Sequence, residues 1–228
     1  MSTSTQPQEL RYLGYLVTPE GLGPDEGKVA AFKQFSTPKT VKNVQQFLGM
    51  MSYYRRFISG YARIAEPMIA LMREDASFVW STDCQVSFDY LKQQLISAPV
   101  LILPGFKNPF AVHTDACDMG LGAALTQIGE DGLERAVAFA SRTLHKSERL
   151  NSASEKECLG VIWALEHFRP YIEGSSVTVV MDHNSLRWLM TRPSPSGRLA
   201  QWCLRLQDFD FEVVHRPSSA NLVLDALS

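Results

Sequence analysis

The spacing of apolar residues divides the chain into an N-terminal part with helical periodicity and a C-terminal part with alternating strands and helices. In the N-terminal part, apolar residues recur three and four positions apart, which is typical of amphipathic helices. The first predicted helix uses Thr37 as its cap and Pro38 in its first turn, and ends at Ser59–Gly60. Shorter helices are predicted over residues 62–74 and 81–98. Ahead of them, "LRYLGYLVTPEGLG" combines β-prone residues with Pro and Gly and predicts a hairpin.

The C-terminal part predicts an α/β fold. Its runs are first three strands, then helix, strand, helix, strand and a terminal helix. In chain order they are residues 109–115, 121–127, 135–142, 152–171, 175–182, 197–207, 209–217 and 221–228. Between the two parts, "VLILPGFKNP" has the Pro and Gly of a connector, and we expect the domain boundary near Leu103 to Asn108.

Charge is distributed unevenly between these parts. The net charge is −2, which by itself does not indicate a nucleic-acid-binding protein. From Lys28 to Arg73, however, there are eight basic residues and one acid, Glu66, so this segment carries +7 and the remainder −9. The asymmetry suggests a polyanion-binding part beside a carboxylate-bearing part.

The four cysteines are far apart and form no Cys-x-x-Cys pair, which argues against a zinc or thioredoxin-like site. They fit reduced thiols in an intracellular protein. No apolar run is long enough to span a bilayer, and the polar start "MSTSTQPQEL" does not resemble a secretory signal. We therefore expect no membrane partner, a cytoplasmic or nuclear location, and a disordered tail over residues 1–9.

Carboxylates at the ends of two predicted strands are the candidate chemistry. Asp115 follows "AVHT" and Asp182 follows "VTVVM". If these strands are parallel neighbours, their ends bring the two carboxylates together. Glu157 in the long helix and Asp225 in the terminal helix could complete an acidic set, which would favour magnesium because Mg²⁺ prefers oxygen ligands.

Each of these residues also has a structural reading. Asp115 could serve only the turn before Met119–Gly120. Glu157 could form a capping box with Ser154, although Ser152 and Glu155 offer the same box one step earlier and would leave Glu157 available. Asp225 could be a solvated helix residue. His113 shares the strand face of Asp115, and no role is assigned to it.

The chain from about Leu10 resembles the polymerase polyprotein of gypsy-type LTR retrotransposons. Many motifs match in order, and together they are specific. They are "YLGYLVTPEGL", "VQQFLGMMSYYRRFI", "IAEPM", "FVWSTDCQVSFDYLK", "APVL", "TDACDMGLGAAL", "AFASRTL", "EKECLGVIWALEHFRPYI", "VVMDHNSLRWL", "GRLAQWCLRLQDFDFEVVHRP" and "DALS".

The resemblance implies a ribonuclease H domain over residues 108–228, with a mixed five-stranded sheet and flanking helices. It implies cleavage of the RNA strand of an RNA–DNA hybrid, leaving a 3′ hydroxyl and a 5′ phosphate. Two Mg²⁺ ions, or alternatively Mn²⁺, would be held by four acids, and the Asp-His pair of the family would give His183 a supporting role. The four acids map to Asp115, Glu157, Asp182 and Asp225.

Residues 10–103 resemble the end of a reverse transcriptase: a small α+β region with a primer-gripping hairpin, a helical thumb and a connector. Gln45, Gly49 and Tyr53 fall four positions apart on one stripe of the thumb helix. Glycine there would allow a sugar–phosphate backbone to approach closely, or it could be a notch for packing against another helix. Arg55 and Arg56 are candidates for phosphate contact, with an ordinary solvated face as the alternative.

The polymerase site of the family is missing, because this chain contains no Asp-Asp pair. We therefore expect no DNA polymerisation. Three functions remain open: a magnesium-dependent hybrid ribonuclease, a non-catalytic nucleic-acid-binding module derived from a retroelement, and a fragment active only with the rest of its polyprotein.

Overall fold

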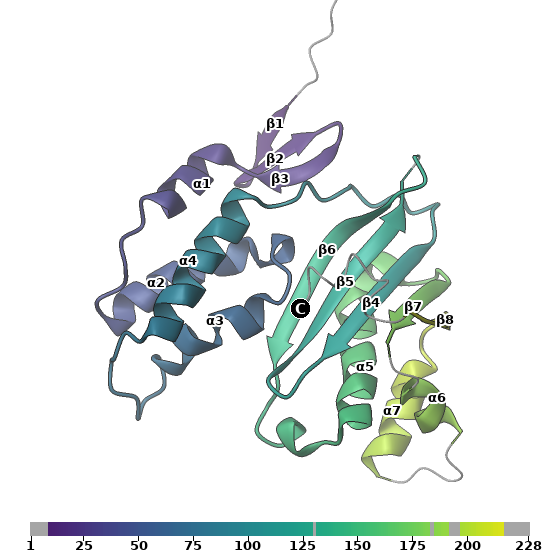
Figure 1. Cartoon of the computed structure of the whole chain (residues 1–228). Coiled ribbons are helices and arrows are strands. Elements are labelled where there is room, and N and C mark those ends of the chain that lie inside the picture. The colour runs from purple at the N-terminus through teal and green to yellow at the C-terminus, as the bar shows by residue number, and fades with distance from the viewer. Residues whose placement is uncertain (1–8, 130, 183–184, 192–196, 217–228) are drawn as a thin grey trace, which may run out of the picture.

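The computed structural model describes residues 9–129, 131–182, 185–191 and 197–216. It contains two sheets with helices packed around them (Figure 1). Residues 1–8 of the predicted tail, the predicted terminal helix at 221–228, Asp225 and His183 lie outside the described residues. No described helix has both the length and the apolar character that crossing a bilayer requires.

The N-terminal part has a three-stranded antiparallel sheet followed by helices, so the predicted hairpin has one strand more than expected. Its elements are β1 (Leu10–Tyr12), β2 (Tyr15–Thr18), β3 (Gly21–Pro24), α1 (Glu26–Lys33), α2 (Val41–Tyr53), the short 3₁₀ helix η1 (Arg55–Phe57), α3 (Tyr61–Ala70) and α4 (Thr82–Ile96).

The C-terminal part is the expected α/β fold with a mixed five-stranded sheet, in the strand order β6-β5-β4-β7-β8. β4, β5 and β6 form an antiparallel meander, while β7 joins β4, and β8 joins β7, in parallel. The elements are β4 (Phe110–Ala116), β5 (Gly120–Ile128), β6 (Glu134–Thr143), η2 (Glu148–Leu150), α5 (Ala153–Ile172), β7 (Val177–Met181), α6 (Ser185–Met190), α7 (Arg198–Leu206) and β8 (Phe211–His215).

Local capping explains where the main helices begin. Ser81 caps α4 by accepting a hydrogen bond from the Cys84 N–H at 3.2 Å. The cap of α2 is Thr40, whose side chain accepts from the Asn43 N–H. The prediction of a start at Thr37 and Pro38 was therefore wrong. Pro38 suited a first turn, but Thr40 is the residue that satisfies an otherwise unpaired helix N–H.

The end of the first predicted helix also differs from the expectation. α2 stops at Tyr53, and the chain continues through η1 to Gly60. Gly60 has φ +60° and precedes α3 as its N-cap, so it starts a helix and does not end one. A left-handed residue at this position turns the chain so that α3 packs against β6.

The two faces of the large sheet are covered by different parts of the chain. α5 packs on one face, against β4 and β5. On the other face α3 and η1 pack against β6, and Figure 1 shows α3 beside this strand. Ala124 of β5 and Phe139 of β6 therefore belong to the hydrophobic core of the N-terminal part. Burial of these apolar side chains holds the two parts together.

Backbone hydrogen bonds add to this connection. Leu22 of β3 and Leu101 of the connector exchange two of them, at 2.6 and 2.8 Å. The next residue, Ile102, donates to the Ala136 carbonyl of β6 at 2.9 Å. The connector is thus hydrogen-bonded to both sheets.

Candidate active site

The parallel pairing of β4 with β7 brings Asp115 and Asp182 to the same edge of the sheet. Each paired residue of β7 lies 67 positions after its partner in β4, from Phe110 with Val177 to His113 with Val180. The same offset, continued by two positions, aligns Asp182 with Asp115. Asp182 also acts electrostatically on Asp115. The expectation that these two strands are parallel neighbours is confirmed.

The first turns of α5 separate the functions of its two glutamates. The capping box is formed by Ser152 and Glu155: the Ser152 side chain accepts from the Glu155 N–H, and the Glu155 carboxylate accepts from the Ser152 N–H at 2.9 Å. Of the two possible boxes, the structure has the earlier one. Glu157 is therefore not needed to cap the helix, and its side chain is only 9% exposed.

Packing of α5 places Glu157 near the end of β4. Gly160 lies three positions later and faces the sheet, where an added Cβ would lie 3.8 Å from Ala116 and 3.7 Å from Leu121. Residues three apart share a face of a helix, so Glu157 lies one turn beyond this contact, towards the edge that carries Asp115. We infer from this packing that Glu157 is a third predicted acid near this end of the sheet.

Electrostatics at this edge favour a bound cation. Burial raises the pKa of Asp115 above its usual value, and the neighbouring charge of Asp182 raises it further. The positive charge of Arg63 and a backbone hydrogen bond from Ala116 act in the opposite direction. Two carboxylates in such a position repel each other, and a hard divalent cation would relieve the repulsion.

The donor chemistry therefore fits Mg²⁺, although the described residues alone do not complete a site. Within the described ranges no three acidic, histidine or cysteine side chains lie close enough to hold a metal ion. Asp115 and Asp182 are the pair that the fold brings together. Glu157 approaches from α5.

The second aspartate of "TDACDMG" has a structural role. Asp118 accepts a hydrogen bond from the ammonium group of Lys156 at 2.6 Å, and this pair connects the turn after β4 to the start of α5. Lys156 is buried, and its contact lowers the pKa of the Asp118 carboxyl. The pair links the turn after β4 to α5 at the residue that precedes Glu157.

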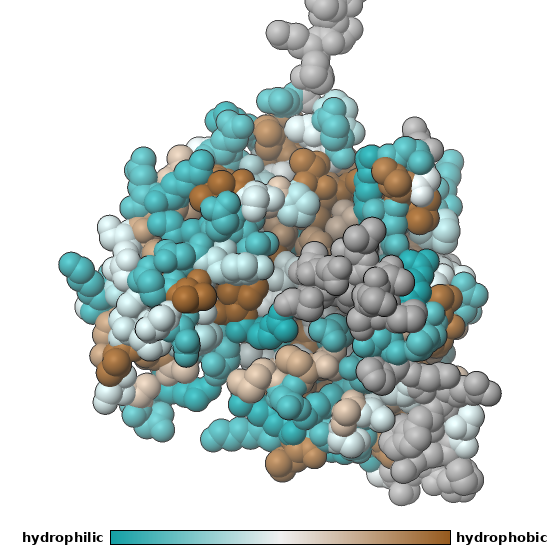
Figure 2. Space-filling view, in the orientation of Figure 1, coloured by the Kyte–Doolittle hydropathy of each residue, from teal (hydrophilic) through white to brown (hydrophobic). Residues whose placement is uncertain are grey.

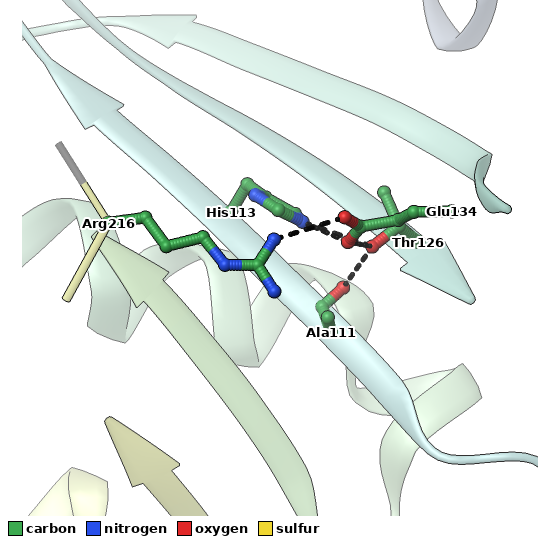
Figure 3. Close-up of polar contacts among 5 residues, drawn as sticks. All are labelled: Ala111, His113, Thr126, Glu134 and Arg216. Carbon is green, nitrogen blue, oxygen red and sulfur yellow. Dashed lines mark hydrogen bonds and ion pairs between the residues drawn. The ribbon is translucent and has the colours of Figure 1, made fainter. Parts of the chain in front are cut away.

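Figure 3 shows a polar network around His113, which lies two positions before Asp115 on β4 and therefore points to the same face of the sheet. His113 is fully buried, and its Nε2 lies 2.6 Å from Glu134 Oε1 and 3.1 Å from Thr126 Oγ1. Thr126 donates to the same carboxylate at 2.7 Å, and Arg216 Nη1 approaches its other oxygen at 3.3 Å. The network joins β4, β5, β6 and the end of β8. No sequence pattern linked His113 to Glu134, which is 21 residues away.

We predict that this network makes stability depend on acid pH. The hydrogen bond from His113 lowers the pKa of Glu134 from its usual 4.5 to about 2, although burial opposes the shift. A lowered carboxyl pKa stabilises the fold above the unfolded value, and the stabilisation is lost as pH falls through the folded value. Glu134→Gln should therefore lower the free energy of unfolding at pH 7, and the difference from the parent should shrink between pH 4.5 and 2.

Urea unfolding at several pH values measures this difference. Glu173→Gln is the control, because the Glu173 side chain is 73% exposed at the end of α5. A pH-independent difference between Glu134→Gln and the parent would contradict the prediction.

The predicted nucleic-acid stripe on α2 is exposed. Gln45, Gly49 and Tyr53 all face solvent, and a Cβ on Gly49 would meet no atom of the described chain within 4 Å. Gly49 is therefore not a packing notch within this chain. Tyr53 stacks on Tyr15 at 5.0 Å, and its hydroxyl donates to the Leu13 carbonyl in the β1–β2 turn. Through these contacts Tyr53 connects the exposed stripe of α2 with the β1–β2 turn.

We predict that Gly49→Ala raises the stability of the chain and weakens its binding to the hybrid. Alanine in an exposed helix interior is more stable than glycine by about 1 kcal/mol, which should raise Tm by roughly 2–4 °C in a chain of this size. If a nucleic-acid backbone lies against Gly49, the added methyl group should weaken hybrid binding. Gln46→Ala, one position off the stripe, should leave binding unchanged. Unchanged binding in Gly49→Ala would exclude close backbone approach at this position.

Arg55 and Arg56 differ from each other in their surroundings. Arg55 is exposed. Arg56 is partly buried and donates from Nη2 to the Tyr171 hydroxyl of α5 at 3.4 Å. The alternative of a solvated face is therefore wrong for Arg56, which lies between the two parts of the chain.

The four cysteines are free thiols, and Cys84 and Cys158 are buried.

The face shown in Figure 2 is mainly hydrophilic, with hydrophobic residues in scattered groups. On the described part of that face, a polar ligand is a better match than a large apolar one.

A mixed five-stranded sheet in the order β6-β5-β4-β7-β8, with acids at the end of its central parallel pair, defines a ribonuclease H-like fold. Residues 105–209 match the family model described as the RNase H-like domain found in reverse transcriptase. Over these residues the chain is thus similar to the RNase H-like domain of reverse transcriptases, as the sequence resemblance predicted.

Its relatives include polyproteins of transposons. It is 37% identical over 97% of its length to the retrovirus-related Pol polyprotein from transposon 297 of Drosophila melanogaster. It is 34% identical over 96% of its length to the transposon Tf2-3 polyprotein of Schizosaccharomyces pombe. The chain spans about a fifth of these relatives, 20% and 17% respectively.

Solved structures show the same fold over both parts of the chain. A foamy viral protease–reverse transcriptase in complex with double-stranded DNA superposes with TM-score 0.78 and 20% identity, covering 91% of this chain and 38% of that one. The same kind of protein in complex with an RNA/DNA hybrid gives 0.76 and 20%, covering 91% and 29%.

Proposed function

We propose that this chain cleaves the RNA strand of RNA–DNA hybrids with magnesium as cofactor, as the ribonuclease H part of a retrotransposon reverse transcriptase. The convergence of Asp115 and Asp182 at the end of the β4–β7 pair carries the proposal. Similarity to transposon Pol polyproteins supports it, as does the fold shared with a reverse transcriptase that is described in complex with an RNA/DNA hybrid.

Different side chains would bind the metal and the substrate. Asp115, Glu157 and Asp182 would hold the metal from the described part of the chain, with Asp225 as the proposed fourth ligand and His183 beside them. Two magnesium ions, when bound, supply the charge that stabilises the attacking and leaving oxygens of a phosphodiester displacement. Glu157 is only 9% exposed, so it would reach the metal from the protein side of the site.

The exposed stripe of Gln45, Gly49 and Tyr53, together with Arg55, would contact the hybrid away from the cut. We propose no polymerisation by this chain, since its sequence has no Asp-Asp pair. We further propose that it acts within the cell, in the cytoplasm or nucleus, with the rest of a polymerase polyprotein as a partner.

The test is incubation of the purified chain with a labelled RNA–DNA hybrid, in magnesium, in manganese and with chelator. We expect the RNA strand to be cut only with metal, and the DNA strand and a DNA duplex to remain intact. Tight binding without cleavage would replace the proposal by a non-catalytic binding module. Cleavage that appears only after adding the polymerase half would identify an incomplete enzyme.

A further inference from the structure

The first turn of α3, which belongs to the N-terminal part, is fixed against the sheet edge that carries the acids. The Ala62 N–H donates to Ser141 Oγ of β6 at 2.9 Å. Ser141 pairs with Gly122 of β5, and Gly122 pairs with Asp115 of β4. Arg63, the residue after Ala62, is therefore anchored beside the strand end that carries Asp115.

Arg63 and Asp115 share a small hollow of ≈ 20 Å³. Its lining comes from both parts of the chain: Gly60 and Arg63 from the N-terminal part, and Asp115, Gly122, Ser141 and Arg142 among others from the C-terminal part. Arg63 is exposed, and its charge lowers the pKa of Asp115 against the effects of burial and Asp182. The guanidinium is thus close enough to Asp115 to influence the acidic site.

The other arginine of the hollow has a different function. Arg142 forms a two-pronged pair with Glu148, at 2.7 and 2.9 Å, and its guanidinium lies over the Trp163 ring at 5.8 Å. Its charge is therefore balanced within the C-terminal part. Arg63 is the basic residue that the N-terminal part contributes to the hollow.

We propose that Arg63 binds a phosphate of the hybrid next to the cut, so that both parts of the chain build the active site. This inference rests on the proposed function. A guanidinium suits the task because it presents paired N–H donors that match phosphate oxygens. A cation at the rim of an acidic edge also offsets the repulsion between the carboxylates and an approaching polyanion.

The affinity of the chain for the hybrid, measured with chelator present, tests the contact between Arg63 and phosphate in the absence of cleavage. We expect Arg63→Gln to raise Kd about tenfold, the effect of losing one hydrogen-bonded ion pair. The slope of log Kd against log salt should fall by about 0.9, the value for one phosphate contact. Arg169→Gln removes the same charge about 18 Å further along α5 than Glu157 and should leave both quantities nearly unchanged.

Cleavage in magnesium tests the position next to the cut. Arg63→Gln should raise KM about tenfold with a smaller effect on kcat, and Arg63→Lys should restore the salt slope, because the charge remains. Tm of each variant detects a purely structural effect, which should be small for an exposed side chain.

The outcomes separate the inference from the proposed function. If the parent cleaves and Arg63→Gln matches it in Kd, salt slope and KM, the inference is wrong and the proposed function stands. If the parent does not cleave but Arg63→Gln still weakens binding, the proposed function fails and phosphate binding by Arg63 stands. Unchanged binding overturns the inference in either case.

Discussion

Replacing Glu157 by glutamine is expected to lower the rate of hybrid cleavage by more than about 100-fold, while the fold is retained. Even an outer partner of a metal ligand contributes roughly 10–100-fold to activity, and a direct ligand should contribute more. Asp115→Asn is expected to act similarly. Because glutamine and asparagine keep the shape of the side chain and remove its charge, the loss would report on chemistry and not on packing. Initial rates of RNA cleavage, with Tm as a folding check, measure the effect.

The matched control for Glu157 is its neighbour Glu155. Glutamine can also complete a capping box, so Glu155→Gln should keep the start of α5 intact. It would weaken the 2.7 Å ion pair with Arg198, whose side chain is 52% exposed, and pairs with an exposed partner contribute little. We therefore expect nearly parental cleavage. Equal losses of cleavage rate in the two variants would mean that both glutamates affect activity only by stabilising α5.

The second large effect is expected on stability, at Gly21. Its φ of +144° is rarely adopted by residues with a side chain, and an added Cβ would collide with the Leu101 carbonyl. Gly21→Ala should lower the free energy of unfolding by about 2–3 kcal/mol, the cost of a strained backbone combined with overpacking. It should also disrupt the two hydrogen bonds between Leu22 and Leu101. Urea unfolding gives the magnitude.

Gly23, two residues later on the same strand, is the control for this prediction. A Cβ there would meet no described atom within 4 Å, so Gly23→Ala should be tolerated. If both variants were equally destabilised, the cause would be loss of glycine in the strand and not the contact with Leu101. If neither variant were destabilised, the Gly21 strand and the connector at Leu101 would be able to move apart at little cost.

The five-stranded sheet could be predicted from sequence because its strands have strong patterns and are separated by clear turn residues. α1 was missed although Asp25 caps it and Glu26 lies in its first turn, because its eight residues have little amphipathic pattern. α6 has six residues, too few to show a helical period. The start of α2 was misplaced since both Thr37 and Thr40 are plausible caps and only the structure decides between them.

The sequence indicates candidate site residues where strand geometry decides their positions, and it does not where tertiary packing decides them. Parallel neighbours bring their ends together, so Asp115 and Asp182 could be paired from sequence. Arg63 could not, because nothing local distinguishes it from the other basic residues of its segment. Its proximity to Asp115 depends on packing of α3 against a strand almost 80 residues away, through the hydrogen bond to Ser141.

The shared core also has a consequence for the order of folding during synthesis. The N-terminal part leaves the ribosome first, and a chain emerges at about 5–20 residues per second. Its helices can therefore be packed before β5 and β6 appear. Ala124 and Phe139 then meet an apolar surface that already exists. The first half of the chain would thus act as a template for the meander and would shield its exposed face from aggregation while β7 is still being made.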